Sequence, residues 1–195
     1  MLVMSEKNVG DKIYPLGYEP QETPDSDDHD VRNHLLDFIL KSGPTEFIDT
    51  DLFAVMARRR STRKFSDKPV ETVKIDKIIA AADTAPTAGN FQGFEIFYVK
   101  SVEKKKLLVQ ACNKQPYVNA PVVFVFCKNP SRVKFDFPEY VLKKFAIQDA
   151  TLAAGYSQLA AQALGLSSIW IGMFDEQKVM DIIGTDLVPS SVLCI

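Results

Sequence analysis

A cluster of cationic side chains lies between residues 58 and 65, where the sequence reads RRRSTRKF. Five positive charges fall within seven positions, and two hydroxyl groups, Ser61 and Thr62, stand among them. Guanidinium groups donate charge-assisted and often bidentate hydrogen bonds to phosphate oxygens. The cluster therefore indicates a binding site for a phosphate monoester, with Ser61 near a sugar or polyol hydroxyl. The alternative is a solvated helix end, whose cations are stabilised by the negative end of the helix dipole.

Other residues that could do chemistry are scarce. The two histidines, His29 and His34, are far in sequence from the other motifs, so a Ser-His-Asp or Cys-His arrangement is poorly supplied. The HEXXH, P-loop and GxGxxG motifs are absent. The three cysteines form no CxxC pair, so the sequence indicates neither a disulfide framework nor a metal site. If the protein is an enzyme, we expect a bound cofactor, and no catalytic side chain, to carry its chemistry.

Composition narrows the class of protein. The chain has 195 residues, 46% of them hydrophobic, and a net charge of −2, which is typical of one globular domain with a local basic cluster. A nucleic-acid-binding domain is usually basic over a whole face. The N-terminus lacks the apolar core of a signal peptide, and no apolar run reaches the roughly 18 residues of a membrane span. We therefore expect a cytoplasmic protein with no nucleic-acid or membrane partner.

Hydrophobic periodicity divides the chain into an extension and a domain. Residues 1–48 combine a polar, acidic arm with a short helix at 31–41, and residues 49–195 form the domain. Within the domain, alternating patterns predict an α+β or α/β fold. Helices are expected over 52–60, capped by Asp49 or Thr50, and over 71–83, 102–112, 138–165 and 176–184, and strands over 94–99, 120–127, 166–174 and 190–195.

The long helix predicted at 138–165 has one face of small side chains. Small residues allow another helix to approach closely, and two interpretations remain open. The face is buried inside one subunit, or it is the self-complementary interface of a homodimer. The residues concerned are Ala146, Ala150, Ala153, Ala154, Ser157, Ala160 and Ala161.

Three segments, taken in order, resemble the FMN-dependent nitroreductase family. They read RRSTRKF, APTAGNFQGFEIFYV and AIQDATLAAGYSQLAAQALGLSSIWIGMF, and they are similar to the family's RRSxRxF, its APSxxNxQPWxFxVV, and its long central helix followed by GLGSxWIG. The match runs from Asp51 to the last residue. The resemblance implies an α+β, nitroreductase-like fold: a central, mainly antiparallel sheet flanked by helices, in an intertwined homodimer with two FMN sites at its interface.

The resemblance also assigns roles within the basic cluster. It places Arg59 at the FMN phosphate, with Arg60 and Ser61 along the phosphate and the ribityl chain. It places Arg63 at the pyrimidine edge of the flavin, near N1 and O2. A cation at that edge stabilises the reduced, anionic flavin and raises its reduction potential.

Further cofactor-binding residues follow from the other two motifs. A loop from the second subunit is expected to cover the flavin, with Gly89 permitting close backbone approach. Backbone groups of residues 171–173 are expected near flavin N5, and Gln115, or else Asn113, at the pyrimidine ring. Trp170 is expected in the core. The loop residues are Pro86, Thr87, Ala88 and Asn90, and the residues near N5 are Ile171, Gly172 and Met173.

The chain departs from the family pattern in two places. Gly93 stands where the family has a proline, so we expect a looser loop after Asn90. Family members also continue beyond the last strand, with a turn and a basic segment that binds the phosphate, whereas this sequence ends at Ile195. Three interpretations remain open: the N-terminal 50 residues compensate, the chain is truncated, or FMN binds weakly.

The leading hypothesis is an FMN-dependent NAD(P)H oxidoreductase. Hydride passes from NADH or NADPH to flavin N5 and then, by ping-pong, to a small acceptor such as a nitroaromatic, a quinone, a free flavin or an enone. This chemistry requires no protein nucleophile, in agreement with the scarcity of histidine. The alternatives are a non-catalytic flavin- or nucleotide-binding protein that has lost part of the phosphate site, and an unrelated enzyme that uses another phosphate ligand.

Overall fold

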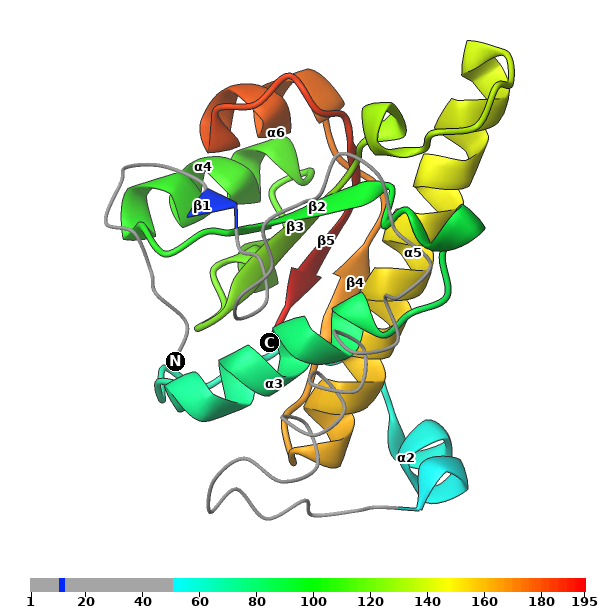
Figure 1. The fold of residues 1–195 in the computed structure, drawn as a ribbon. Coiled ribbons are helices and arrows are strands. Elements are labelled where there is room, and N and C mark those ends of the chain that lie inside the picture. The colour runs from blue at the N-terminus through cyan, green and yellow to red at the C-terminus, as the bar shows by residue number, and fades with distance from the viewer. Residues whose placement is uncertain (1–10, 13–50) are drawn as a thin grey trace.

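A five-stranded antiparallel sheet forms the centre of the protein (Figure 1). The computed structural model describes residues 11–12 and 51–195. The strands follow the order β1-β2-β3-β5-β4, and each neighbouring pair is antiparallel. Apart from residues 11–12, which form β1, the predicted arm and the helix at 31–41 lie outside the described residues. The strands are β1 Asp11–Lys12, β2 Phe94–Tyr98, β3 Val123–Lys128, β4 Ile169–Ile171 and β5 Pro189–Cys194.

Helices cover both faces of this sheet. On one face α3 and α5 bury alternate side chains of β2 and β3, and on the other face α4 and α6 bury the remaining ones (Figure 1). This two-sided burial explains why β3, in the middle of the sheet, is a continuous apolar run. The helices are α2 Leu52–Arg58, α3 Thr72–Asp83, α4 Val102–Ala111, α5 Glu139–Ala163 and α6 Glu176–Ile183, with short 3-10 turns η1 Ala88–Asn90, η2 Pro116–Val118 and η3 Pro130–Arg132.

Most predicted elements are found within a few residues of their expected bounds, and the differences have local causes. Helix α2 is capped by Asp51, whose carboxylate accepts hydrogen bonds from the N–H groups of Phe53 at 2.9 Å and Ala54 at 3.2 Å, so the expected caps Asp49 and Thr50 are wrong. Strand β4 has three residues where nine were expected. Its start is shortened because the Leu166 N–H donates to Ala161 O at 2.8 Å and closes the end of α5.

The small-residue face of α5 packs inside the chain. Ala150, Ala153 and Ala154 are at most 1% exposed and lie in the core formed with α3 and the sheet. The Ser157 hydroxyl donates to Ile78 O of α3 at 3.5 Å. The interpretation of this face as a homodimer interface is therefore wrong, because the close approach that small residues permit is already used by α3 and the strands.

Trp170 was expected in the core, and this expectation is wrong. Its side chain is 45% exposed and does not lie in the core. Strand β4 is at the edge of the sheet, so residues on it have a neighbouring strand on one side only. Among the described residues, no helix has the length and apolar character needed to cross a membrane.

Candidate functional site

The basic cluster forms an extended segment that lies beside β4. Helix α2 ends at Arg58, and the chain then pairs with the residue before β4 through a parallel bridge between Ser61 and Ser168. The Thr62 N–H donates to Ser168 O at 3.0 Å. Phe65 then packs against the buried residues that include Ile169 and Ile171. The cluster therefore starts near the beginning of β4 and runs in the same direction as that strand.

The arginines of this segment divide into two groups. The Arg60 guanidinium donates to Ala57 O at 2.5 Å and to Arg59 O at 2.9 Å, so it satisfies carbonyl groups at the end of α2. The helix-end interpretation is thus correct for Arg60. The side chains of Arg59 and Arg63 make no hydrogen bond or ion pair within the described part of the chain, and Arg63 is exposed while Arg59 is half-buried. These two guanidinium groups are available to an anionic ligand.

The backbone just after β4, at Gly172, is exposed to solvent. Gly172 is exposed, and a Cβ atom built on it would meet no atom within 4 Å. The Asn113 side-chain amide donates to Met173 O at 3.3 Å, and the Asp175 N–H donates to Ala111 O at 2.9 Å. The segment after β4 is therefore held against the end of α4, while space remains in front of Gly172.

The two candidates for the pyrimidine ring differ in their contacts. The Gln115 side-chain oxygen accepts a hydrogen bond from the Tyr117 hydroxyl within η2. Asn113, in contrast, reaches the segment 172–173 directly. The structure thus brings Asn113 to the expected flavin N5 region, while the Gln115 oxygen is engaged by Tyr117.

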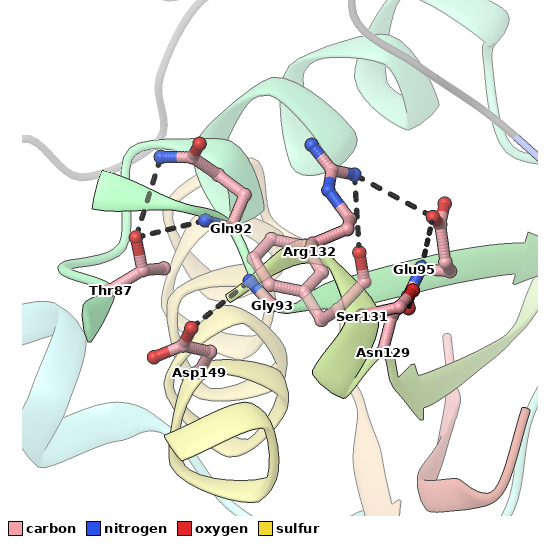
Figure 2. A network of polar contacts seen from close by, with 9 residues as sticks. Thr87, Gln92, Gly93, Glu95, Asn129, Ser131, Arg132 and Asp149 are labelled. Atoms are coloured by element: carbon pink, nitrogen blue, oxygen red, sulfur yellow. Dashed lines mark hydrogen bonds and ion pairs between the residues drawn. The ribbon is translucent and has the colours of Figure 1, made fainter. Parts of the chain in front are cut away.

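The loop between α3 and β2 is compact and internally hydrogen-bonded (Figure 2). The Thr87 hydroxyl oxygen accepts from the backbone N–H of Gln92 at 3.2 Å and from its side-chain amide at 3.4 Å. The same Gln92 amide donates to the Asn90 side-chain oxygen at 2.9 Å. Gly89, Asn90 and Gln92 all have positive φ angles, which close the turn η1. Thr87 and Asn90 thus each use their side-chain oxygen to shape the loop itself.

A buried carboxylate, which sequence reasoning missed, holds this loop to α5 (Figure 2). Asp149 is 2% exposed, and its two oxygens accept from the N–H groups of Ala88 and Gly93, each at 3.0 Å. Burial raises the pKa of Asp149, while the two N–H groups oppose this effect by stabilising the carboxylate. The available signal was an acidic residue on the small-residue face of a helix, where an ionised side chain requires partners.

Gly93 is held on both sides, contrary to the expectation of a looser loop. Its N–H donates to Asp149, and its C=O accepts from the Asn129 N–H at 2.8 Å. A Cβ atom at this position would lie 2.8 Å from Val133 Cγ2, 2.9 Å from Asp149 Oδ2 and 3.3 Å from Ala146 Cα. Only glycine both donates this N–H group and fits the space available here.

A second polar network lies next to Gly93, at the start of β2. Buried Glu95 accepts from the Asn129 side-chain amide at 2.9 Å and forms an ion pair with Arg132 at 3.6 Å. The Ser131 hydroxyl donates to the Asn129 side-chain oxygen at 2.6 Å (Figure 2). This network fixes η3 against the sheet and so supports the residues that surround Gly93.

Comparison with known proteins agrees with this arrangement. A sequence model of the nitroreductase family matches residues 56–119 and 110–195. The chain belongs to the nitroreductase family. It is 32% identical over 125 residues to an FMN reductase of Bacillus subtilis, in a match that covers 58% of this chain and 50% of that protein.

Solved structures confirm the expected α+β fold of this family. The NfrA1 nitroreductase of Bacillus subtilis superposes with a TM-score of 0.68 and 27% identity, over 74% of this chain and 65% of that one. The NADPH:FMN oxidoreductase of Vibrio harveyi, complexed with NAD+, gives a TM-score of 0.67 and 27% identity, over 73% and 66%. The chain thus spans half to two thirds of the length of these relatives.

Proposed function

We propose that this nitroreductase-family chain is an FMN-dependent NAD(P)H oxidoreductase, with residues 49–195 as its FMN-binding domain. The observation that carries the proposal is the pair of guanidinium groups, at Arg59 and Arg63, that have no partner among the described residues. They lie on a segment that runs beside β4 toward the exposed backbone of Gly172. Relatives named as an FMN reductase and an NADPH:FMN oxidoreductase support it. When bound, FMN takes hydride from NADH or NADPH and passes electrons to a small acceptor.

The residues present fit this cofactor. Arg59 is the proposed phosphate ligand, because its guanidinium has no partner in the described part of the chain and its donors are open to an anion. Arg60 fixes the backbone of Arg59 through its bonds to the end of α2, and Ser61 is proposed to bind the ribityl chain. Arg63 is the proposed cation at the flavin's N1 and O2 edge.

The remaining residues are proposed to enclose the flavin. Residues 171–173 supply backbone groups near N5, where Gly172 leaves room for a planar ring. Asn113 is now the proposed residue beside the pyrimidine ring, in place of Gln115, which was the first candidate. No protein nucleophile or general base is required, since the cofactor supplies the reactive atom.

A homodimer is part of the proposal. The loop 86–92 contacts α5 and the segment after β3, whereas the basic segment contacts β4, so a second copy is the proposed source of the loop that covers each flavin. Apolar side chains exposed in one chain support burial by a partner. They include Leu52, Phe53 and Met56 on α2, and Ile147, Leu152 and Tyr156 on α5.

An anaerobic titration tests the function. Purified protein is mixed with FMN, freed of excess cofactor, and titrated with NADH or NADPH while the flavin absorbance near its visible maximum is recorded. Retained yellow colour that NAD(P)H bleaches, and that nitroaromatic or quinone addition restores, is the expected result. Retained FMN that neither nucleotide bleaches would instead support a non-catalytic flavin-binding protein, and no retained FMN would refute the proposed oxidoreductase.

A further inference from the structure

Among the described residues, the buried carboxylate of Asp149 makes contacts that point to the proposed cofactor site and not only to the core. Asp149 lies on α5, where the neighbouring buried residues are alanines that pack against α3 and the sheet. Its two oxygens reach out of this helix to the N–H groups of Ala88, the first residue of η1, and of Gly93, which follows the loop 86–92. One side chain thus holds the backbone on both sides of the three positive φ angles at Gly89, Asn90 and Gln92.

We propose that Asp149 is a positioning residue, which sets the shape of the loop 86–92 for contact with FMN through the N–H groups of Ala88 and Gly93. The inference rests on the proposed function, in which this loop covers the flavin. Asp149 itself does not touch the cofactor. Its effect passes through the loop backbone, because the start of η1 at Ala88 and the residue after the loop, Gly93, are bonded to the same carboxylate.

The anchoring uses Gly93, a position at which this sequence departs from the family pattern. The proline expected from the family pattern has no N–H group to donate. In this chain Gly93 supplies that donor, and the missing Cβ makes room for Asp149 Oδ2, which would lie 2.9 Å from it. Gly93 and Asp149 therefore form a matched pair, in which the carboxylate requires the glycine and the glycine's N–H satisfies the carboxylate.

Ala88 offers a way to remove one anchor alone. It is the first residue of η1, a position where proline is tolerated because its N–H makes no bond inside the turn. The preceding Thr87 has φ −131° and ψ 157°, the extended conformation that a residue before proline prefers. Ala88→Pro thus removes the N–H that Asp149 accepts and leaves the surrounding packing of α5 in place.

The experiment compares FMN affinity among folded variants. Asp149→Asn and Ala88→Pro are expected to bind FMN about tenfold more weakly than the original chain, and the double variant only slightly more weakly than either, because both changes release the same contact. Ser157→Ala is the matched control, since its hydroxyl is equally buried on α5 but bonds to α3. It is expected to lower the melting temperature without changing FMN affinity.

Amide hydrogen exchange of the FMN-free proteins provides a readout independent of the cofactor. The Gly93 amide and the peptide 86–93 should exchange faster in Asp149→Asn and Ala88→Pro, but not in Ser157→Ala. Unchanged exchange, or equal FMN affinity in all four variants, overturns the positioning role. If the original chain binds no FMN, the proposed function fails, and this outcome is distinct from a chain that binds FMN equally well with and without Asp149.

Discussion

Replacement of Gly93 should destabilise the fold by an amount that the local geometry determines. The alanine Cβ would lie 2.8 Å from Val133 Cγ2 and 3.3 Å from Ala146 Cα, well inside the 3.5–4.0 Å of an ordinary carbon contact. Val133 is 3% exposed, and Ala146 Cα belongs to the backbone of α5, so neither atom can move into solvent. Such overpacking costs about 1–3 kcal/mol, which is the expected loss for Gly93→Ala.

Gly93→Pro should cost more, because it also removes the N–H that Asp149 accepts. A hydrogen bond to a charged group contributes about 1.5–3 kcal/mol, so the total loss is about 2.5–6 kcal/mol. Gly155→Ala is the matched control, since a Cβ there meets no atom within 4 Å and the residue lies inside α5. It should stabilise the protein by about 0.5–1 kcal/mol through helix propensity.

Urea unfolding of the FMN-free proteins, followed by circular dichroism at one protein concentration, measures these differences. The expected order of stability is Gly155→Ala, then the original chain, then Gly93→Ala, then Gly93→Pro. The steric reasoning is refuted if Gly93→Ala matches the original chain. The hydrogen-bond reasoning is refuted if Gly93→Pro is no less stable than Gly93→Ala.

Three further predictions concern the proposed site and the buried thiols. Arg59→Ala should weaken FMN binding, measured by calorimetry, roughly tenfold to a hundredfold, because a charge-assisted hydrogen bond contributes about 1.5–3 kcal/mol. Arg63→Gln should mainly lower the reduction potential of the bound flavin, by about 30 mV for each 1.4 kcal/mol of lost stabilisation. If both variants lose FMN equally, the cluster binds only the phosphate. Burial raises the pKa of Cys112 and Cys127 to about 12, so at pH 8 both thiols are protonated, and mass spectrometry should find them unmodified by iodoacetamide in native protein but alkylated in urea. A mixed dimer of one Arg59→Ala chain and one Asp149→Asn chain should have one tight FMN site. At that site the intact Arg59 of one chain meets the intact loop of the other across the interface. If no tight site forms, the loop and the phosphate site belong to the same chain.

The sequence was sufficient where a feature depends on neighbouring residues in the chain. The apolar run of β3, the amphipathic pattern of α3 and the end of α6 at Gly184, which has a left-handed φ of 75°, were all predicted. The three ordered motifs were enough to identify the family. These features are local because helix and strand periodicity record only which side of an element is buried.

The structure decided which partner each buried or charged side chain meets. The alanine face of α5 could have packed against a second subunit or within the chain, and only the position of α3 selected the latter. Arg60 and Arg63 look equivalent in the sequence, yet Arg60 bonds to the end of α2 while Arg63 remains available. The roles in FMN binding stay predictions.

Asp149 shows most clearly why the sequence alone was insufficient. Its two bonds reach residues 61 and 56 positions away along the chain. No local pattern records such a distance, because hydrogen-bond partners are selected by how the sheet and α5 pack together. The sequence therefore determined the elements and the family, whereas tertiary packing alone decided that a carboxylate on α5 holds the loop beside Gly93.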